Sequence, residues 1–266
     1  MTKILIVGDS HASRGALRTA VDEAANRGME KVFVVGDFGF WPNDTFAGQD
    51  FLESVVQNGK NTGIITYFLP GNHEDWRAYL DLILDGEADE DGFVLYDEGG
   101  WLRAAPPVHN WSWDGVRFGS VGGAYSIDRS MRTLNRSWFK EEIPQLDYPE
   151  QLAECDVLLT HDAPINLAIV HGWENRVQPS EEAEAEQSHM VIYQCIEKAK
   201  PQIVVHGHWH LPCQYPSDFG TIIGLDQSSG GYWPKALAVL DTEARKIYNW
   251  NQFVYDPEGP GLWQLS

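Results

Sequence analysis

Five apolar segments of this sequence are each followed at once by side chains that can bind a divalent metal ion. In chain order these side chains are Asp9 and His11, Asp37, Asn72 and His73, His161, and His208 with His210. Carboxylate oxygens and neutral imidazoles are ligands of ions such as Mn, Fe, Co, Ni and Zn. One Asp can bridge two such ions about 3.5–4 Å apart, the separation used for in-line displacement at phosphorus. The residue types therefore indicate a two-metal site suited to a phosphate ester.

The charge of the chain restricts which phosphate compounds it can bind. The formal net charge is -20, from 39 acidic and 19 basic residues, and such a surface repels nucleic acid at long range. Two divalent ions held by only two carboxylates can still make one cleft positive. We therefore expect a small phosphate-ester or nucleotide substrate and no stable complex with nucleic acid.

The ligands must be positioned by strands that alternate with helices. Apolar runs at residues 4–7, 32–35 and 64–69 read as strands, and residues 16–25 and 51–56 fit helices between them. This alternation predicts an α/β fold with a largely parallel sheet, in which the carboxyl ends of the strands line the ligand crevice. Further strands are expected at residues 156–160, 203–205, 219–225, 236–240 and 246–250, antiparallel strands within 93–121, and loop with short helix over 130–149. A helix is expected to open near residues 181–187 and to run past residue 196. We predict one domain over residues 1–255 and an irregular tail over 256–266.

The cysteines and the first residues bear on the cellular location. Cys155, Cys195 and Cys213 form no CxxC pair, so neither a zinc ribbon nor a disulfide framework is indicated. The apolar run that ends at Val7 is too short for a signal peptide or a membrane span. We predict a cytoplasmic protein without membrane contact, and the oligomeric state cannot be predicted.

The ordered motifs resemble those of a known family. Asp9-x-His11, Gly36-Asp37, Gly71-Asn72-His73-Glu74, His161 and Gly207-His208-x-His210 are similar, in the same order, to the motifs of calcineurin-like metallophosphoesterases. The resemblance implies a four-layer α/β/β/α sandwich of two mixed sheets flanked by helices. It also implies two divalent ions, Mn first, with Fe, Zn, Co or Ni as alternatives. Asp9, His11, Asp37 and His210 would hold one ion, and the bridging Asp37 with Asn72, His161 and His208 would hold the other.

The same resemblance assigns roles in the reaction to Asp37, Asn72 and His73. A hydroxide that bridges the two ions would attack phosphorus, while Asn72 stabilises charge on the phosphate and His73 protonates the leaving oxygen. Glu74, Asp162 and His206 would support the ligands through hydrogen bonds, although a ligand role for His206 is the minority alternative.

Two sequence differences from protein Ser/Thr phosphatases indicate which branch of the family this chain resembles. Pro70 stands before Gly71 where they carry an Arg, and Phe38-Gly39-Phe40-Trp41 follows Asp37 where they carry Asp-Arg-Gly. The pattern is more similar to small bacterial and phage phosphodiesterases. Residues Gly122–Arg129 of this chain also resemble a segment found in bacterial and phage members of the family. In that segment Arg129 could clamp the phosphate and Tyr125 could contact the substrate. Arg129, Arg132 and Arg136 could equally form surface ion pairs.

Other interpretations remain for the function as a whole. A Gly-Asp pair after a strand can be a simple turn or helix cap, but the joint pattern with the histidines favours metal binding. The first hypothesis is hydrolysis of phosphodiesters such as nucleotides or cyclic nucleotides. The alternatives are a phosphomonoesterase, and a metal-containing scaffold or nucleotide-binding subunit without turnover. A di-metal oxidase is disfavoured because such sites use helix-borne Glu and Glu-x-x-His spacing.

Overall fold

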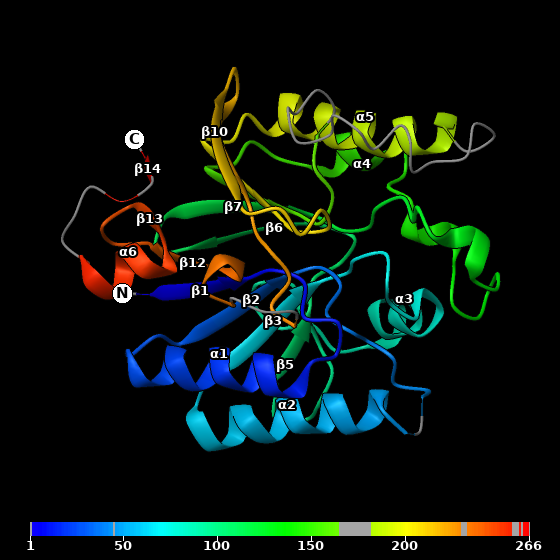
Figure 1. The fold of residues 1–266 in the computed structure, drawn as a ribbon, viewed down its shortest axis with the longest axis horizontal. Coiled ribbons are helices and arrows are strands. Elements are labelled where there is room, and N and C mark those ends of the chain that lie inside the picture. The colour runs from blue at the N-terminus through cyan, green and yellow to red at the C-terminus, as the bar shows by residue number, and fades with distance from the viewer. Residues whose placement is uncertain are drawn as a thin grey trace.

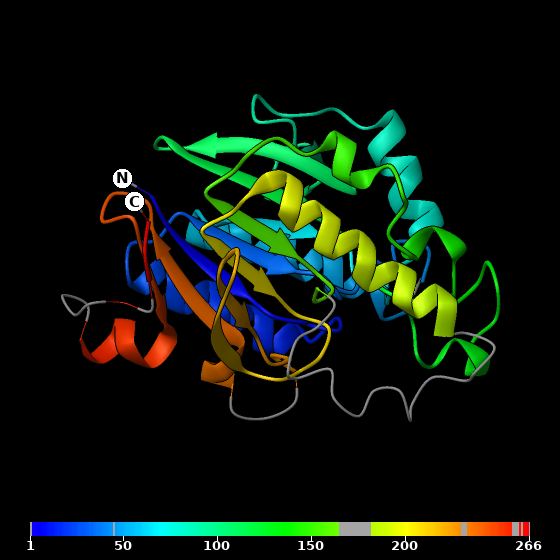
Figure 2. The same ribbon diagram turned by 90° about the horizontal axis from the view of Figure 1, so that it is seen from above.

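Two mixed β-sheets lie face to face in the middle of the molecule, and helices cover their outer faces (Figure 1). The structure is a computed structural model that describes residues 2–44, 46–164, 182–229, 233–256, 261 and 263–265. The turned view in Figure 2 shows helix α5 lying across the second sheet. This arrangement confirms the α/β/β/α sandwich expected from the sequence.

The first sheet has eight strands in the order β14-β13-β12-β1-β2-β3-β5-β4. Its strands β1, β2, β3 and β5 are neighbours and parallel, whereas β12 runs antiparallel to β1. The bounds are β1 Lys3–Val7, β2 Lys31–Val35, β3 Ile65–Leu69, β4 Val94–Leu95, β5 Leu102–Ala104, β12 Leu237–Asp241, β13 Lys246–Asn249 and β14 Trp263–Gln264.

The second sheet has six strands in the order β10-β11-β9-β8-β7-β6. Strands β7, β8, β9 and β11 are parallel, and the antiparallel strands β6 and β10 form the two edges. The bounds are β6 Val108–Trp113, β7 Val116–Val121, β8 Val157–Thr160, β9 Ile203–His206, β10 Cys213–Ser217 and β11 Gly220–Gly224.

The continuous apolar runs of the strands arise because both faces of each sheet are covered. In β1, Ile4 and Ile6 face the second sheet, whereas Leu5 and Val7 face the helices. Aromatic residues such as Phe33 fill the space between the sheets. Side chains alternate along a strand, so a strand between two apolar layers cannot show the polar–apolar alternation of a half-exposed strand.

Helices α1, α2, α3 and α6 pack on the first sheet, and α4 and α5 pack on the second. Their bounds are α1 Arg14–Asn26, α2 Gly48–Thr62, α3 Trp76–Asp85, α4 Tyr148–Gln151, α5 Glu182–Ala199 and α6 Trp250–Tyr255. In α1 the buried positions Leu17, Ala20, Val21 and Ala24 follow the three-to-four-residue spacing of one helix face. Short 3-10 turns at Arg129–Met131, Lys140–Glu142 and Trp233–Ala236 complete the elements.

Several elements depart from the sequence expectations. Helices α3 and α6 and the strand β10 were not expected, and the tail that was expected to be irregular contains β14, which pairs with β13. The expected strands, and the helices α1, α2 and α5, are present with shifted ends. Within residues 93–121 the pairs β4–β5 and β6–β7 are antiparallel as expected, but β5 also lies parallel to β3 and β7 parallel to β8. Among the described residues, no helix is both long and apolar enough to cross a bilayer.

Candidate metal centre

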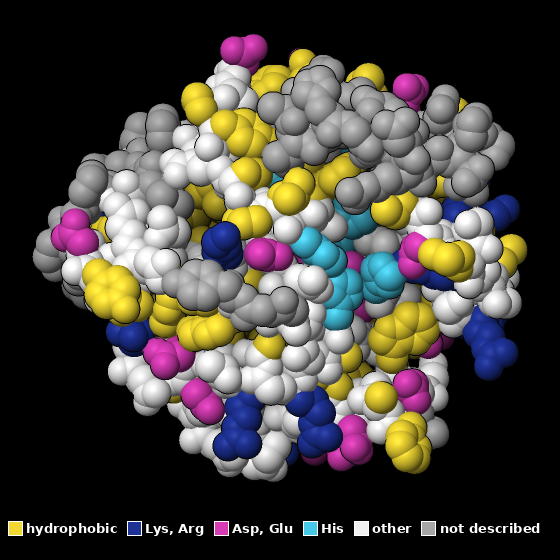
Figure 3. Space-filling view, in the orientation of Figure 1, with side chains coloured by type: hydrophobic (Ala, Val, Ile, Leu, Met, Phe, Trp, Pro, Cys, Tyr) yellow, Lys and Arg dark blue, Asp and Glu magenta, His cyan; other side chains and the backbone are white. Residues whose placement is uncertain are grey.

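The predicted ligands come from the carboxyl ends of parallel strands in both sheets. Asp9, Asp37 and Asn72 follow β1, β2 and β3, which are neighbours in the first sheet. His161 follows β8 and His208 follows β9, its neighbour in the second sheet. The two sheets place these loops together, and Figure 3 shows histidine side chains gathered at one place on this face of the molecule.

One group of possible ligand atoms is formed by Asp9, His11 and His210. The Nε2 atom of His210 lies 2.9 Å from Oδ2 of Asp9, and the Nε2 atoms of His11 and His210 are 3.2 Å apart. Asp9 is fully buried, whereas the two histidine rings are half-buried.

A second group is formed by Asp37, His161 and His208. Nε2 of His161 lies 3.3 Å from Oδ1 of Asp37 and 3.0 Å from the side-chain oxygen Oδ1 of Asn72. The rings of His161 and His208 are neighbours, with centroids 4.9 Å apart. The Asn72 side-chain oxygen thus lies beside this group, and its role as a metal ligand stays a prediction.

Asp37 links the two groups. Its Oδ2 atom lies 3.8 Å from Nε2 of His11, while its Oδ1 atom faces His161. Within the described part of the chain, Asp9 and Asp37 form ion pairs with histidines and with no Lys or Arg side chain. Two buried carboxylates surrounded by imidazoles fit a pair of divalent cations, because buried charges need a partner of opposite sign.

Burial and neighbouring charges shift the pKa values of all three residues in the second group. Burial alone would raise the pKa of Asp37, but His161, His73 and His11 outweigh it and hold this pKa well below its usual range. Burial alone would lower the pKa of His161, yet the Asp37 carboxylate outweighs it and raises this pKa to about 10. Burial lowers the pKa of His208 to about 4, so this ring is neutral near pH 7, as a metal ligand requires.

Main-chain groups of neighbouring loops hold the carboxylates in place. The amide of His208 donates to both carboxylate oxygens of Asp9, at 3.0 and 3.1 Å, and the amide of His73 donates to Oδ1 of Asp37 at 2.8 Å. Gly36 lets His161 approach, because a Cβ at Gly36 would come within 2.0 Å of Nδ1 of His161. Gly36 also has a φ of +92°, which favours glycine.

Glu74 is fully buried and holds the loop that follows Asp37. Its carboxylate accepts from the amides of Phe38 at 2.7 Å, Gly39 at 3.0 Å and Phe40 at 2.5 Å. Burial, reinforced by Asp37, raises the pKa of Glu74 to about 7. The three amides belong to the Phe38-Gly39-Phe40 segment that follows Asp37, and the supporting role of Glu74 toward the metal ligands stays a prediction.

Asp162 and His206 also lie directly behind the ligand loops. Asp162 is fully buried and accepts from Ser188 Oγ at 2.7 Å and from Nε1 of Trp209 at 3.2 Å. His206 is fully buried, and its Nδ1 atom lies 3.0 Å from the carbonyl oxygen of Gly207. Neither residue is in the two groups of possible ligands, so their supporting role stays a prediction.

His73 stands at a cavity of about 280 Å³ beside both groups. One guanidinium nitrogen of Arg132 lies 2.9 Å from Nδ1 and 2.6 Å from Nε2 of His73. Burial lowers the pKa of His73, Asp37 offsets part of this, and Arg132 lowers it further. Near neutral pH the ring is therefore uncharged and carries one N–H that it can donate. The cavity is lined by His11, Asp37, Asn72, His73, Tyr125, Ile127, Asp128, His189, His208, Trp209 and His210.

The predicted substrate contacts have different surroundings. Tyr125 lines the cavity, whereas Arg129 forms an ion pair with Glu184 and stacks its guanidinium 5.2 Å from the Tyr125 ring centre. From the sequence, a surface ion pair is possible for Arg132 as it is for Arg129. In the structure Arg132 contacts His73 and forms an ion pair with Asp128. Substrate binding by Tyr125 and Arg129 stays a prediction.

Two buried residues next to the site were not singled out from the sequence. The Asn72 amide Nδ2 donates to Ser126 Oγ at 2.9 Å, and the Ser126 hydroxyl donates to Oε1 of Glu142. Both residues are fully buried, and burial raises the pKa of Glu142 to about 8. The only sequence signal was that Ser126 lies within the Gly122–Arg129 segment that resembles bacterial and phage members.

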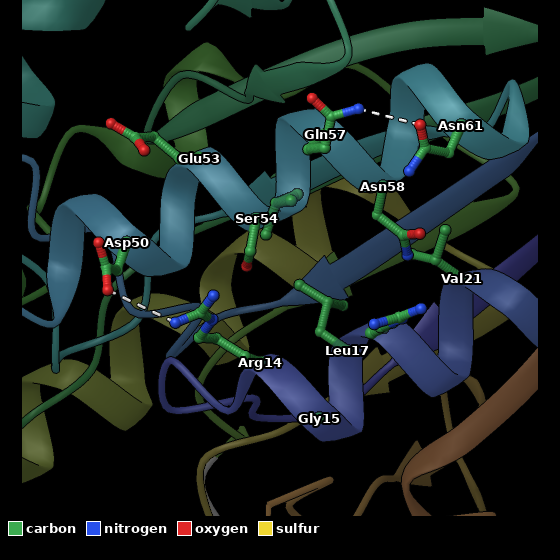
Figure 4. A pocket seen from close by; sticks show the side chains of 12 residues that line it. Arg14, Gly15, Leu17, Val21, Asp50, Glu53, Ser54, Gln57, Asn58 and Asn61 are labelled. Atoms are coloured by element: carbon green, nitrogen blue, oxygen red, sulfur yellow. Dashed lines mark hydrogen bonds and ion pairs between the residues drawn. The ribbon is translucent and has the colours of Figure 1, made fainter.

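A larger cavity, of about 600 Å³, lies between α1 and α2 and has a different character (Figure 4). Its walls carry the ion pair of Arg14 with Asp50 and polar side chains such as Gln57 and Asn61. None of the predicted ligands lines it. The larger cavity therefore lacks the donor residues that the sequence predicts, whereas the smaller one is lined by several of them.

Comparisons with known proteins bear on the family and the fold of the chain. The family model described as calcineurin-like phosphoesterase matches residues 2–212. The protein TT1561 of Thermus thermophilus is similar in structure, with a TM-score of 0.56, 15% identity, and 92% of this chain and 96% of that chain covered. A dimetal phosphatase from Danio rerio matches with a TM-score of 0.48, 13% identity, and 90% and 91% of the two chains covered. A novel archaeal phosphodiesterase matches with a TM-score of 0.47, 14% identity, and 92% and 97% covered. No curated protein matches the sequence.

Proposed function

The chain belongs to the calcineurin-like phosphoesterase family, and from this premise we propose that it is a dinuclear hydrolase of phosphodiesters such as nucleotides or cyclic nucleotides. The observation that carries the proposal is the pair of ligand groups linked by Asp37, with His73 at the cavity beside them. When bound there, two divalent cations, Mn first, would supply a bridging hydroxide as nucleophile and neutralise charge on the phosphate.

The protein groups contribute position and protons. Asp37 and Asn72 present oxygens toward the phosphate-binding face, and the buried hydrogen bonds to their loops keep these oxygens from reorienting during the reaction. His73 faces the cavity as a neutral imidazole, so its N–H can be given to the leaving oxygen. Arg132 places a permanent positive charge next to His73, where it balances the negative charge that develops on the phosphate.

The preference for a small diester is supported by the size and charge of the cavity. A volume of about 280 Å³ favours a small ester, and Tyr125 and Trp209 offer apolar ring surface beside the phosphate site. The net charge of -20 opposes association with a long polyanion. A cytoplasmic location stays a prediction from the sequence.

The proposal is tested with protein from which metal has been removed and then restored with Mn²⁺. The substrate panel contains 2′,3′- and 3′,5′-cyclic nucleotides, a chromogenic diester and the matching monoester. We expect Mn-dependent cleavage, with kcat/KM for at least one diester exceeding that for the monoester by tenfold or more. Preferential cleavage of the monoester would replace the diesterase by a phosphomonoesterase on the same site.

The competing hypothesis is a metal-containing scaffold or nucleotide-binding subunit without turnover. It predicts that Mn²⁺ binds and that no ester in the panel is cleaved faster than by the Asp37→Asn variant. His73 at the cavity favours an enzyme, because a scaffold has no need of a proton donor beside its metal ligands.

A further inference from the structure

The loop between β7 and α4 reaches back to the loop that carries Asn72 (Figure 1). The amide of Gly123 donates to the carbonyl of Pro70 at 2.8 Å, which ties the start of this loop to the segment that precedes Asn72. Gly123 has a φ of +83°, and a Cβ there would come within 2.2 Å of the carbonyl oxygen of Glu142. The two ends of the loop thus approach each other directly behind Asn72.

A chain of buried hydrogen bonds runs through this contact. The Asn72 amide donates from Nδ2 to Ser126 Oγ at 2.9 Å, Ser126 donates to Oε1 of Glu142, and the Phe139 amide donates to Oε2 of Glu142 at 3.3 Å. Asn72 is 2% exposed, and Ser126 and Glu142 are 0% exposed, so water does not compete for these groups. Through Oε2 the carboxyl of Glu142 caps the 3-10 turn Lys140–Glu142, and through Oε1 it reaches Ser126, so both oxygens of this buried acid have a partner.

The direction of these bonds decides which end of the Asn72 amide faces the metal residues. Only the oxygen of an amide can be a metal ligand, and the two ends have the same shape. Because the Ser126 hydrogen points at Glu142, the Ser126 oxygen is left as an acceptor and requires the NH₂ end of Asn72. Oε1 of Glu142 can accept as a carboxylate oxygen or as the carbonyl oxygen of the protonated acid. The opposite end, Oδ1, then lies 3.0 Å from Nε2 of His161, inside the second ligand group.

We propose that Ser126 and Glu142 are positioning residues that fix the Asn72 amide with its oxygen toward the metal site. This inference rests on the proposed ligand role of Asn72 and adds two residues to the machinery of the same reaction. Partners of metal ligands typically change metal affinity by about 10–100-fold when they are removed. Loss of the Ser126 hydroxyl lets the amide rotate, so that a share of the molecules presents NH₂ to the cation.

The test measures Mn²⁺ affinity by equilibrium dialysis, together with the Mn²⁺ concentration that gives half-maximal diesterase activity. We expect Ser126→Ala to weaken binding of one of the two ions by about 10–100-fold. Activity should return toward that of the parent at saturating Mn²⁺, with an unchanged KM for the diester. Glu142→Leu should behave like Ser126→Ala, whereas Glu142→Gln keeps an oxygen for Ser126 and should stay within about threefold of the parent.

The matched control is Ser120→Ala. Ser120 is a fully buried serine on β7 whose hydroxyl has no hydrogen-bond partner among the residues that the structure describes, so its removal should change neither affinity nor activity. Circular dichroism and thermal melting of each variant separate a local effect from loss of fold, and Glu142→Gln keeps the test decisive if Glu142→Leu does not fold.

The outcomes separate this inference from the proposed function. If Asn72→Ala weakens Mn²⁺ binding while Ser126→Ala and Glu142→Leu behave like Ser120→Ala, the positioning role is wrong and the proposed function stands. If Asn72→Ala itself leaves Mn²⁺ binding and activity unchanged, the proposed ligand set fails and the positioning role falls with it.

Discussion

Four of the predicted ligands have a backbone conformation that side-chain-bearing residues rarely adopt. The φ angles are +46° at His11, +42° at Asp37, +63° at His208 and +51° at His210. Left-handed backbone at residues with a side chain is uncommon and concentrates at functional sites, where the surrounding structure holds it. Each of these residues lies two to four residues after the end of a strand, in the loops that bring the ligand groups together.

The ligand role of this cluster predicts a large loss when Asp37 or His208 is changed. We expect Asp37→Asn and His208→Ala to lower kcat/KM for a diester by at least about 100-fold, in line with losses of key electrostatic groups. Asp37→Asn keeps the shape but removes the charge between the two groups. Turnover within a few-fold of the parent, in an assay supplemented with Mn²⁺, would refute the assigned roles.

The proton-donor role of His73 predicts a loss that depends on the leaving group. We expect His73→Ala to cost tenfold or less on a nitrophenyl ester, which departs without protonation, and about 100-fold on an alkyl or nucleoside ester. The comparison is the kcat/KM ratio for the two substrates in the variant and the parent. His109→Ala serves as control, since its ring binds the Asp91 carbonyl outside the site. Equal losses on both substrates would exclude a proton donor.

The raised pKa of His161 predicts a proton release when metal binds. In the metal-free protein Asp37 raises this pKa to about 10, so His161 is protonated at pH 8, and a bound cation must displace that proton. The sign follows: lower pH opposes binding, and the apparent Mn²⁺ affinity rises about tenfold per pH unit between pH 7 and 9. Calorimetry in buffers of different ionisation enthalpy measures the release, and a histidine of ordinary pKa would release almost none at pH 8. His161→Gln should remove this component.

At the scale of the elements, the strand ends were predictable and the loop behind them was not. A buried strand that stops at Gly-Asp or Gly-Asn-His is a local pattern, so the sequence predicts Asp37 and Asn72 at the edge of a sheet. Ser126 and Glu142 act through contacts that span 54 and 16 residues within an aperiodic loop, for which spacing gives no signal. Helix α3 was missed because its sequence WRAYLDLILD is apolar on several sides, and Leu84 is 80% exposed.

A prediction for a single element concerns the loop after β2, which the buried Glu74 carboxylate holds in place. Glu74 accepts four main-chain hydrogen bonds from this loop and from Gly71. In Glu74→Gln one oxygen becomes an NH₂ group that faces N–H donors, so we expect about 1–3 kcal/mol of lost stability and a lower metal affinity. Urea unfolding with and without Mn²⁺ measures both effects. As a matched comparison, Glu87→Gln changes an exposed acid of the same charge and should leave both unchanged. A Glu74→Gln protein as stable as the parent would show that the carboxylate is not needed to hold the Asp37 loop.

At the scale of the whole molecule, the acidic surface and the candidate site have opposite effects on the binding of a phosphate. A net charge of -20 favours loosely bound cations anywhere on the surface, and it repels a phosphate until local positive charge is present. The fold places the imidazoles of the two ligand groups together at one edge of the sandwich, where strand ends of both sheets meet. Net charge could be counted from the sequence, but this separation of charge depends on how the sheets face each other.

Stability in the presence of metal distinguishes the site from the acidic surface. A ligand that binds only the folded state stabilises it by about 2.7 kcal/mol at 100 times its Kd. For a chain of this size that corresponds to a rise in Tm of roughly 5 °C per specifically bound ion. We expect Mn²⁺ at low millimolar concentration to raise the Tm of metal-stripped protein by this amount or more, and Asp37→Asn to lose most of the rise. Because Asp37→Asn alters the net charge by only one unit, general screening of the surface persists in it. An equal rise in Tm for both proteins would therefore assign the stabilisation to the surface, and the linked ligand groups at the strand ends would no longer be needed to explain it.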